Sequence, residues 1–351
     1  MLRPWFWVLF ALAAMAISPA AMAKPASDRI VAVGDLHGDY EAWEAIALAA
    51  GLVDAKGRWA GGNATLVQMG DVADRGPDSL KIIRQLMKLQ REAKGKGGKV
   101  IALVGNHEAM NMTGDLRYVH PGEFRAFTDR DSKPRRDRIY EANKAAIEAA
   151  YRATTPDMKA EAIRDAWMKA NPVGMLEHQL AWGPEGEIGK WVIANPAVVK
   201  LGDSLFVHGG ISAAYTQFSP EQINRRVADA LKARDEAPTS IINDPAGPLW
   251  YRGLVTRQPG DEATVAPVAA SGQQLTIDQE IGLVLEAFHV SRIVVAHTPS
   301  PAGIVSADKG ALWRIDSAIS RAYGGKLTYL EIIGDKVTAR EVPRPAAKPW
   351  G

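Results

Sequence analysis

The chain has 351 residues, of which 47% are hydrophobic, so it is long enough to bury a sizeable core in one large domain or in two. Its formal net charge of +2 is too small to predict nucleic acid or an anionic membrane surface as a partner. The absence of cysteine excludes disulfides, thiolate catalysis and cysteine-based zinc sites. Any hydrolysis by this chain must therefore use metal-activated water, a carboxylate or a hydroxyl group.

The first residues have the pattern of a cleavable export signal. The apolar stretch Trp5–Ile17 is too short to span a bilayer comfortably, and Ser18 and Pro19 interrupt it. The sequence Ala21-Met22-Ala23 then has the small-x-small form of a signal-peptidase site. We expect residues 1–23 to be removed and the mature chain to be periplasmic or secreted, without stable membrane insertion. The alternative is an uncleaved membrane anchor.

Three apolar runs in the first third of the chain each end in a glycine that is followed by polar residues. The runs predict buried strands, and the helical patterns between them predict a mostly parallel sheet. Polar residues that follow such strands converge on one edge of the sheet. The leading polar residues occur at almost equal spacing, and they are Asp35, Asp71 and Asn106. We interpret Asp39 differently, as the N-cap of a helix over about Tyr40–Ala50.

Residues 109–175 differ in composition from the rest of the chain. The dense charge run Asp129–Arg138 predicts a solvated loop. Two helices are expected after it, the second starting at Thr155 and ending at Asn171, so that a helical insertion covers about 136–175. The insertion is either a structural flap or a cap that shapes the mouth of a substrate site.

Strand patterns return in the second half and place two more histidines at strand ends. Leu205–Val207 leads to His208, and Ile293–Ala296 leads to His297. A hairpin that turns at Gly334 is expected to close the fold. The tail, residues 343–351, is rich in proline and alanine, so we expect it to be disordered.

The residues at the strand ends predict a centre for two metal ions. Two cations about 3.5–4 Å apart need a bridging ligand, and a carboxylate bridges readily. We expect Asp71 to be the bridge, with Asp35 and His37 completing one site. The expected ligands of the other ion are Asp71, Asn106, His208 and His297. Oxygen and imidazole donors of this kind suit two divalent transition-metal ions, manganese first, with iron or zinc as alternatives.

The same residues suggest a reaction at phosphorus. A hydroxide held between two ions is placed for in-line attack on a phosphoryl group. The phosphoryl oxygens need cationic clamps, for which Arg75 and Arg252 are the candidates, together with Asn106 as a substrate contact. The leaving group needs a proton, and we predict His107 as the acid with Asp74 fixing its tautomer. Ordinary surface or core roles are expected for the remaining histidines, His120, His178 and His289. Asp316 is left outside the site, as a supporting or structural residue.

Five sequence blocks carry a resemblance to a known family. GDLHG, GDVADRG, GNHE, HGG and a late histidine at a strand end resemble those of the calcineurin-like metallophosphoesterases, and more narrowly the phosphoprotein phosphatases. The segments NMTGDLRYV and GPLWYRG are similar to the bacterial Shewanella-like phosphatases. The resemblance covers about 30–340 and implies an α/β (α+β) fold, a β-sandwich flanked by helices in a domain over 24–342. The resemblance also implies the same metal ligands, the same proton donor and the same phosphate-binding arginines as those named above.

The leading hypothesis is therefore a metal-dependent phosphomonoester hydrolase. A phosphoprotein phosphatase acting on Ser/Thr, on Tyr or on both is expected, with phosphorylated proteins, peptides or small phosphate esters as partners. Hydrolysis of dinucleoside polyphosphates or small phosphate esters is the alternative within enzymes. An alternative of another class is a phosphate- or metal-binding module without catalysis. The presence of both His107 and Asp74 argues against that module, because binding alone needs no proton donor.

Overall fold

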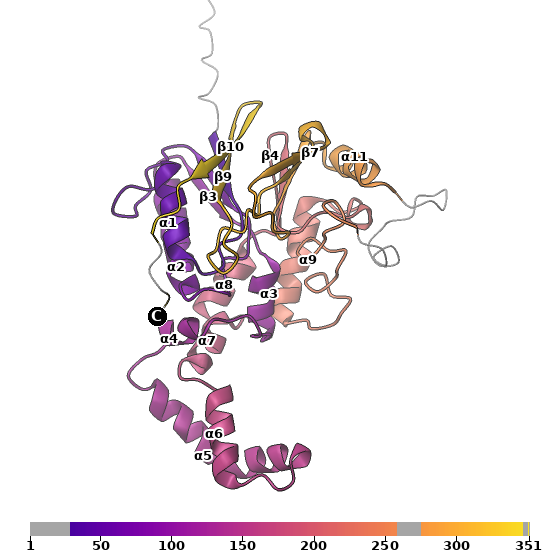
Figure 1. Ribbon diagram of the computed structural model, residues 1–351. Helices are drawn as coiled ribbons and strands as arrows, with labels where there is room; N and C mark the ends of the chain where they lie inside the picture. Colours follow the sequence, from indigo (N-terminus) through magenta and orange to yellow (C-terminus); the bar gives the residue numbers. More distant parts are fainter. Residues whose placement is uncertain (1–28, 258–274, 347–349, 351) are drawn as a thin grey trace, which may run out of the picture.

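Two five-stranded mixed sheets form the centre of the molecule in the computed structural model, which describes residues 29–257, 275–346 and 350 (Figure 1). The predicted export signal, residues 1–23, lies outside this range. The first sheet has the order β10-β9-β1-β2-β3 and the second the order β4-β5-β6-β8-β7. Their bounds are β1 Arg29–Val33, β2 Thr65–Gln68, β3 Lys99–Ala102, β9 Leu327–Ile333, β10 Lys336–Val342, β4 Val198–Leu201, β5 Ser204–Val207, β6 Arg292–Val295, β7 Val305–Ala307 and β8 Leu312–Arg314.

Each sheet has three neighbouring parallel strands, β1, β2 and β3 in the first and β5, β6 and β8 in the second. The other pairings are antiparallel, including the expected hairpin of β9 and β10 at Gly334. The prediction of a mostly parallel sheet therefore holds for the three N-terminal runs but not for the whole. The two-sheet arrangement implied by the family resemblance is confirmed.

Alternate side chains of the strands enter two different cores. Ile30 and Ala32 of β1 pack between the sheets with residues such as Phe206 and Val294 of the opposite sheet. Val31 and Val33 point the other way, into the larger core that underlies the helices. A strand that is buried on both faces is apolar throughout, which explains the continuous apolar runs of the sequence.

Helices cover the outer faces of the two sheets. Helices α1 and α2 pack against β9 and β3 of the first sheet, and α9 packs against β4 of the second. As expected, the Asp39 side chain accepts the N–H of Ala42 and caps α1. The bounds are α1 Tyr40–Ala49, α2 Ser79–Lys94, α3 Asn106–Thr113, α4 Pro121–Ala126, α7 Met175–Trp182, α8 Glu187–Ala194, α9 Pro220–Ala233 and α11 Ile277–Phe288, with short 3-10 turns η1 Ala213–Tyr215 and η2 Asp308–Gly310.

The predicted helical insertion projects from the body as an arm of two helices, α5 (Ser132–Thr154) and α6 (Ala160–Ala170) (Figure 1). The expected loop over 129–138 is wrong, because α5 already begins at Ser132. An i,i+4 pair between Lys133 and Asp137, 2.8 Å apart, satisfies part of this charge run on the helix surface. The second helix starts five residues later than expected, at Ala160, and ends as predicted at its C-cap, Asn171.

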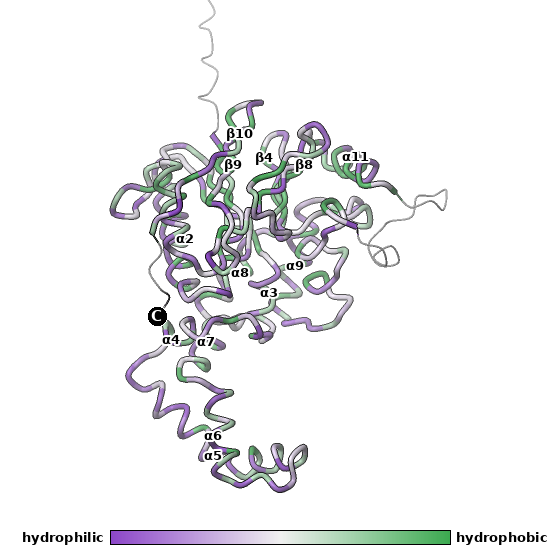
Figure 2. Tube along the Cα trace, in the orientation of Figure 1, coloured by the Kyte–Doolittle hydropathy of each residue, from purple (hydrophilic) through white to green (hydrophobic). Residues whose placement is uncertain are grey.

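The arm has little core of its own. Only Ser132 and Tyr140 of α5 and Ile163 of α6 are buried. Hydrophilic residues occur along much of α5 (Figure 2). No helix among the described residues is both long enough and apolar enough to cross a membrane.

Part of the tail that we expected to be disordered makes contacts. Arg344 donates hydrogen bonds to the carbonyl oxygens of Ile319 and Gly325, at 2.5 and 2.7 Å. The ring of Trp350 lies 5.7 Å from that of His120. The remainder of that prediction falls on residues 347–349 and 351, outside the described range.

Candidate active site

The ends of the six parallel strands bring the predicted residues together from both sheets. Asp35 and His37 follow β1, Asp71 to Arg75 follow β2, and Asn106 and His107 follow β3. In the second sheet His208 follows β5, His297 follows β6 and Asp316 follows β8. All of these side chains except that of Arg75 are buried.

Asp71 lies at the centre of this cluster. Its Oδ2 is 3.3 Å from Nε2 of His208, 3.8 Å from Nε2 of His37 and 3.9 Å from Nε2 of His107. Nε2 of His208 is also 3.0 Å from Oδ1 of Asn106. A carboxylate surrounded by imidazoles from both sheets has the geometry that a bridging ligand needs.

Two groups of donor atoms that could hold a metal ion share Asp71. One consists of Asp71, His208 and His297, and the other of His37, Asp71 and His107, with the donor atoms of each group within 4.8 Å of one another. The first group agrees with the expected second ion site. The second group contains His107 where we expect Asp35, although Asp35 Oδ2 lies 4.0 Å from Nε2 of His37.

The loops that carry these residues are held in an uncommon backbone conformation. His37, Asp71, Asp74, Arg75 and His297 all have positive φ, between 42° and 72°. Each such residue costs free energy and persists only where its surroundings enforce it, which is typical of functional sites. The N–H groups of Leu36 and His37 both donate to the carbonyl oxygen of Asp71, at 3.0 and 2.9 Å, and so lock the first loop onto the second.

The electrostatics of the cluster fit a cation. Burial, followed by the charges of Asp316 and Asp71, raises the pKa of Asp35 well above its usual value. Burial would also raise the pKa of Asp71, but the neighbouring His208, His107 and His37 outweigh it and hold that pKa well below the usual value. Burial lowers the pKa of His37 to about 4 and holds that of His297 well below its usual value.

The donor set fits metal ions on a second, independent ground. Nε2 of His297 is buried and has no hydrogen-bond partner among the described residues. A buried imidazole nitrogen without a partner is costly in the folded state. A metal ion is the natural partner for such a nitrogen beside buried carboxylates.

His107 is oriented by a short hydrogen bond. Its Nδ1 lies 2.6 Å from Oδ2 of Asp74, while Asn111 donates from Nδ2 to Asp74 Oδ1 at 2.9 Å. Nε2 of His107 therefore faces Asp71 and the cluster. Burial opposes the charged imidazole, but Asp71 and Asp74 outweigh it and raise the pKa of His107.

The family model described as calcineurin-like phosphoesterase matches residues 28–301. This chain belongs to that family. It is therefore a hydrolase that acts on phosphoester bonds, and the family implies divalent metal ions at the cluster around Asp71.

Several relatives are similar over much of the phosphoesterase. An uncharacterized protein of Schizosaccharomyces pombe is 31% identical over 312 residues, 86% of this chain and 76% of that protein. Shewanella-like protein phosphatase 2 of Arabidopsis thaliana is 37% identical over 57% of this chain and 51% of its own length. Shewanella-like protein phosphatase 1 of Plasmodium berghei is 27% identical over 78% of this chain and 62% of its own length. The phosphoesterase thus spans only part of the two named phosphatases.

Solved structures share the fold. A cold-active protein-tyrosine phosphatase of a psychrophilic Shewanella species superposes with a TM-score of 0.61 at 23% identity, covering 90% of this chain and 81% of that one. A serine/threonine phosphatase of Saccharomyces cerevisiae gives 0.51 at 13% identity, covering 93% and 82%. At these identities the likeness shows the fold alone.

The phosphoesterase places both predicted arginines at the cluster. The guanidinium carbon of Arg75 lies 3.9 Å from the ring centroid of Tyr118 and 5.8 Å from that of Tyr323. The side chain of Arg252 is exposed, and its charge contributes to the lowered pKa of His297. Neither arginine has a carboxylate within ion-pair distance among the described residues, so both guanidinium groups are available to an anion.

The segment that carries Arg252 is fixed to the loop after β5. The N–H of Gly209 donates to the carbonyl oxygen of Pro248 at 2.9 Å. A side chain at Gly209 would lie 2.9 Å from the backbone of Leu249 and Trp250, so only glycine permits this approach. The two sequence motifs HGG and GPLWYRG thus form one packed unit.

Glu108 is a site residue that the sequence reasoning did not assign. Its carboxylate is buried and accepts the N–H groups of Asp71, Val72, Ala73 and Gly105 at 2.8–3.1 Å. It stands at the third position of α3, where a capping-box glutamate is expected. This position was a signal that could have identified it as the support of the Asp71 loop.

Asp316 was set aside in the sequence reasoning, and the structure places it against the cluster. It is buried, and its charge raises the pKa of Asp35. Burial raises the pKa of Asp316 itself to about 6. The tyrosines Tyr118 and Tyr323 were not predicted either, because their place beside Arg75 depends on folding and not on a motif.

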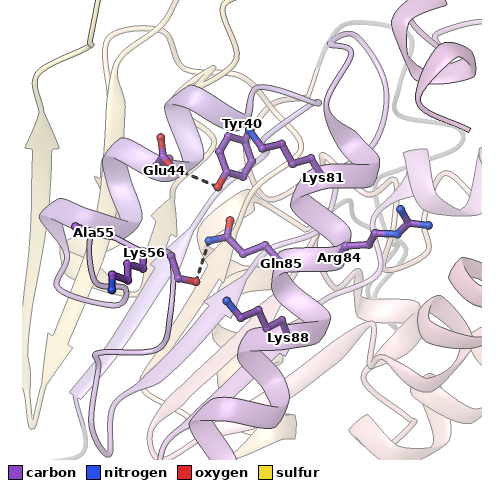
Figure 3. A pocket seen from close by; sticks show the side chains of 9 residues that line it. Tyr40, Glu44, Ala55, Lys56, Lys81, Arg84, Gln85 and Lys88 are labelled. Atoms are coloured by element: carbon purple, nitrogen blue, oxygen red, sulfur yellow. Dashed lines mark hydrogen bonds between the residues drawn. The ribbon is translucent and has the colours of Figure 1, made fainter.

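The other histidines have the ordinary roles expected of them. His178 is buried among aromatic rings, His120 caps α4 and His289 is the C-cap of α11. A separate hollow of about 450 Å³ lies between α1 and α2 and is lined by Lys56, Lys81, Arg84 and Lys88 (Figure 3). It contains none of the predicted site residues, so it is not the candidate active site.

Proposed function

We propose that this phosphoesterase is a metal-dependent phosphomonoester hydrolase that acts on phosphorylated proteins or peptides. The observation that carries the proposal is the His107–Asp74 pair, 2.6 Å apart, whose free nitrogen faces the shared carboxylate Asp71. A hydrolase that expels an alkoxide or a phenoxide needs such a proton donor, whereas a binding module does not.

Each residue has a role that follows from its place. The ligands of two ions would be Asp35, His37, Asp71, Asn106, His208 and His297. When bound, two divalent ions supply an activated water and positive charge for the phosphoryl oxygens. Arg75 and Arg252 orient the phosphoryl group, and Nε2 of His107 donates a proton to the leaving oxygen while Asp74 holds Nδ1.

Two tyrosines favour an aryl ester, and hence phosphotyrosine, over an alkyl ester. The Tyr118 ring lies 5.2 Å from that of His107, the residue that would protonate the leaving oxygen. The Tyr323 ring lies 5.3 Å from that of His37 and 39% of this residue is exposed. Two aromatic side chains beside Arg75 suit a flat ring, and a solved protein of the same fold is a protein-tyrosine phosphatase.

The deciding experiment is an assay of the purified protein loaded with Mn²⁺, Fe²⁺ or Zn²⁺. We expect hydrolysis of phosphotyrosine peptides, less of phosphoserine peptides, and reversible loss of activity on chelation. Asp71→Asn should reduce binding of both ions, whereas His297→Ala should mainly weaken one. Preferential cleavage of diadenosine tetraphosphate would instead support a dinucleoside polyphosphate hydrolase. Metal and phosphate binding without turnover of any substrate would support a binding module.

We also propose that the enzyme acts outside the cytoplasm. The support is the small-x-small cleavage pattern at residues 21–23 after a short apolar stretch. Mass spectrometry of the periplasmic fraction should find a mature chain that begins near Lys24. An intact Met1 on a membrane-bound species would favour an anchor.

A further inference from the structure

Glu123 is a buried carboxylate that no step of the proposed reaction uses. It lies on α4, 49 positions after Asp74, and only 1% of it is exposed. Its Oε1 accepts the backbone N–H of Asp74 at 3.1 Å and the hydroxyl of Ser79. Glu123 therefore touches the residue that holds the predicted acid.

Asp74 needs this support because of its backbone conformation. Its φ of 72° lies in the left-handed region, which a residue with a side chain rarely adopts. The direction of its carboxylate depends on that conformation, and the carboxylate binds both His107 and Asn111. Loss of the acceptor for the Asp74 N–H would leave a buried donor without a partner and favour another backbone conformation.

The second carboxylate oxygen of Glu123 is not engaged with any described residue in a hydrogen bond that would pull the side chain away from Asp74. This atom, Oε2, has no partner among the described residues and lies 3.9 Å from Nε2 of His178. His178 in turn packs against Phe124 and Phe127, with ring centroids 5.3 and 5.0 Å away. The hydrogen bonds that the structure shows for this carboxylate are therefore those of Oε1, with Asp74 and Ser79.

We propose that Glu123 is a positioning residue for the proton donor, acting on His107 through Asp74. The inference rests on the proposed function, in which His107 protonates the leaving group. It follows that loss of Glu123 should impair the protonation step selectively, and should leave metal binding and phosphate binding almost unchanged.

Glutamine is the matched variant for this test. Oε1 accepts two hydrogen bonds while Oε2 makes none, so a glutamine amide can keep its oxygen towards Asp74 and Ser79. Glu123→Gln should therefore retain activity within about threefold of wild type. Glu123→Ala should lower kcat on a phosphoserine peptide by roughly 10- to 100-fold, because the orientation of a general acid is at stake. The exposed Glu141→Ala on α5 is the control.

The readouts separate positioning from general damage. For Glu123→Ala the loss on 4-nitrophenyl phosphate should be several-fold smaller than on the phosphoserine peptide, since a good leaving group needs no proton. The NMR signal of the His107 Nδ1 proton should broaden or shift upfield in this variant and stay in place in Glu123→Gln. Equal losses on both substrates, loss of bound metal, or an unchanged proton signal would overturn the proposal.

The proton signal also separates this inference from the function on which it rests. If wild type hydrolyses neither substrate, the proposed function fails, but the signal still reports whether Glu123 holds Asp74. If Glu123→Ala does not fold, Ser79→Ala provides the test, because it removes one of the two anchors of Glu123 Oε1. Ser79→Ala should then lower kcat more on the phosphoserine peptide than on 4-nitrophenyl phosphate, although less than Glu123→Ala would. An equal loss of kcat on both substrates would contradict the role proposed for Glu123.

Discussion

His107 has the most specific expected signature of any single side chain in the site. His107→Ala removes a proton donor that is needed in the transition state, so kcat on a phosphoserine peptide should fall by roughly 10²–10⁴ with little change in KM. The loss should shrink for 4-nitrophenyl phosphate, whose leaving group is stable without a proton. Steady-state kinetics on the two substrates measures both effects.

The metal content of the same variant provides the control. Nε2 of His107 lies 3.9 Å from Oδ2 of Asp71, close enough for a ligand role to be considered. We expect His107→Ala to keep both ions, because six other side chains supply the assigned ligands and the assigned task of His107 is proton transfer. Loss of an ion, with equal damage on both substrates, would make His107 a ligand and move the acid elsewhere.

Glu108 should contribute strongly to the stability of the folded protein, because it holds the loop after β2. Both of its carboxylate oxygens accept N–H groups, four in all. Glu108→Gln must turn an NH₂ group towards at least one of these donors, so it should lower the free energy of unfolding by about 2 kcal/mol or more. Urea denaturation measures this change. A glutamine variant as stable as wild type would show that the loop after β2 is held by other contacts.

At the residue scale, the sequence was sufficient to place a candidate site residue wherever that residue follows closely on a strand. Asp35, Asp71, His208 and His297 were predictable because an apolar run ending in a short polar turn is local information. Glu123 and Tyr323 reach the same place from helix α4 and from a loop near the C-terminus. No spacing in the sequence encodes those contacts, since they arise from packing between distant segments.

At the level of elements, the arm is separable from the catalytic body. Replacing residues 141–166 by a short Gly/Ser turn should be tolerated, because the Tyr140 and Trp167 rings at the cut lie 5.2 Å apart. Ile163 is the one buried residue that α6 contributes, so the free energy of unfolding should fall by about 2 kcal/mol or less. Thermal or urea unfolding of the shortened chain tests this.

Activity of the shortened chain distinguishes the two roles considered for the arm. A structural flap predicts unchanged turnover of both 4-nitrophenyl phosphate and a phosphopeptide. A cap at the substrate mouth predicts unchanged turnover of the small ester but a clear rise in KM for the peptide. Loss of activity on both substrates would contradict the separation of arm and body.

The element-scale predictions were most accurate for the buried strands, whereas the exposed start of α5 was wrongly predicted to be a loop. The strands are recognisable because both of their faces are covered, so that nearly every position must be apolar. The charged start of α5 carries no such constraint, and Arg135 there is anchored by Glu177 of the distant α7. A helix supported by that tertiary ion pair gives only a weak periodic signal in the sequence.

For the whole molecule, burial of His178 should make the folded state less stable at acidic pH. Burial lowers the pKa of His178 to about 4, against 6.5 for the ordinary side chain. The unfolded chain therefore binds a proton below pH 6.5 that the folded chain refuses, and stability falls as the pH drops from 6.5 to about 4. The difference corresponds to roughly 3 kcal/mol at most.

Comparison with His178→Leu isolates this contribution from the carboxylates that titrate in the same range. The nearest of them is Glu123, whose pKa is raised well above its usual value by burial and by the charge of Asp74. Relative to wild type, the leucine variant should gain stability as the pH falls from 7 to 4. If the free energy of unfolding of the two proteins changed in parallel across this pH range, the prediction would be wrong.

The hydrogen bond from the His297 N–H to Asp35 Oδ1, at 3.4 Å, joins residues that are 262 positions apart. During synthesis Asp35, His37, Asp71 and Asn106 leave the ribosome long before His208 and His297, so the nascent chain carries an incomplete set of donors. Contacts of such long range form late, because a long loop must close first. We therefore expect the ions to be acquired only after the second sheet has docked, so that the metal supply of the compartment where folding finishes selects the ion.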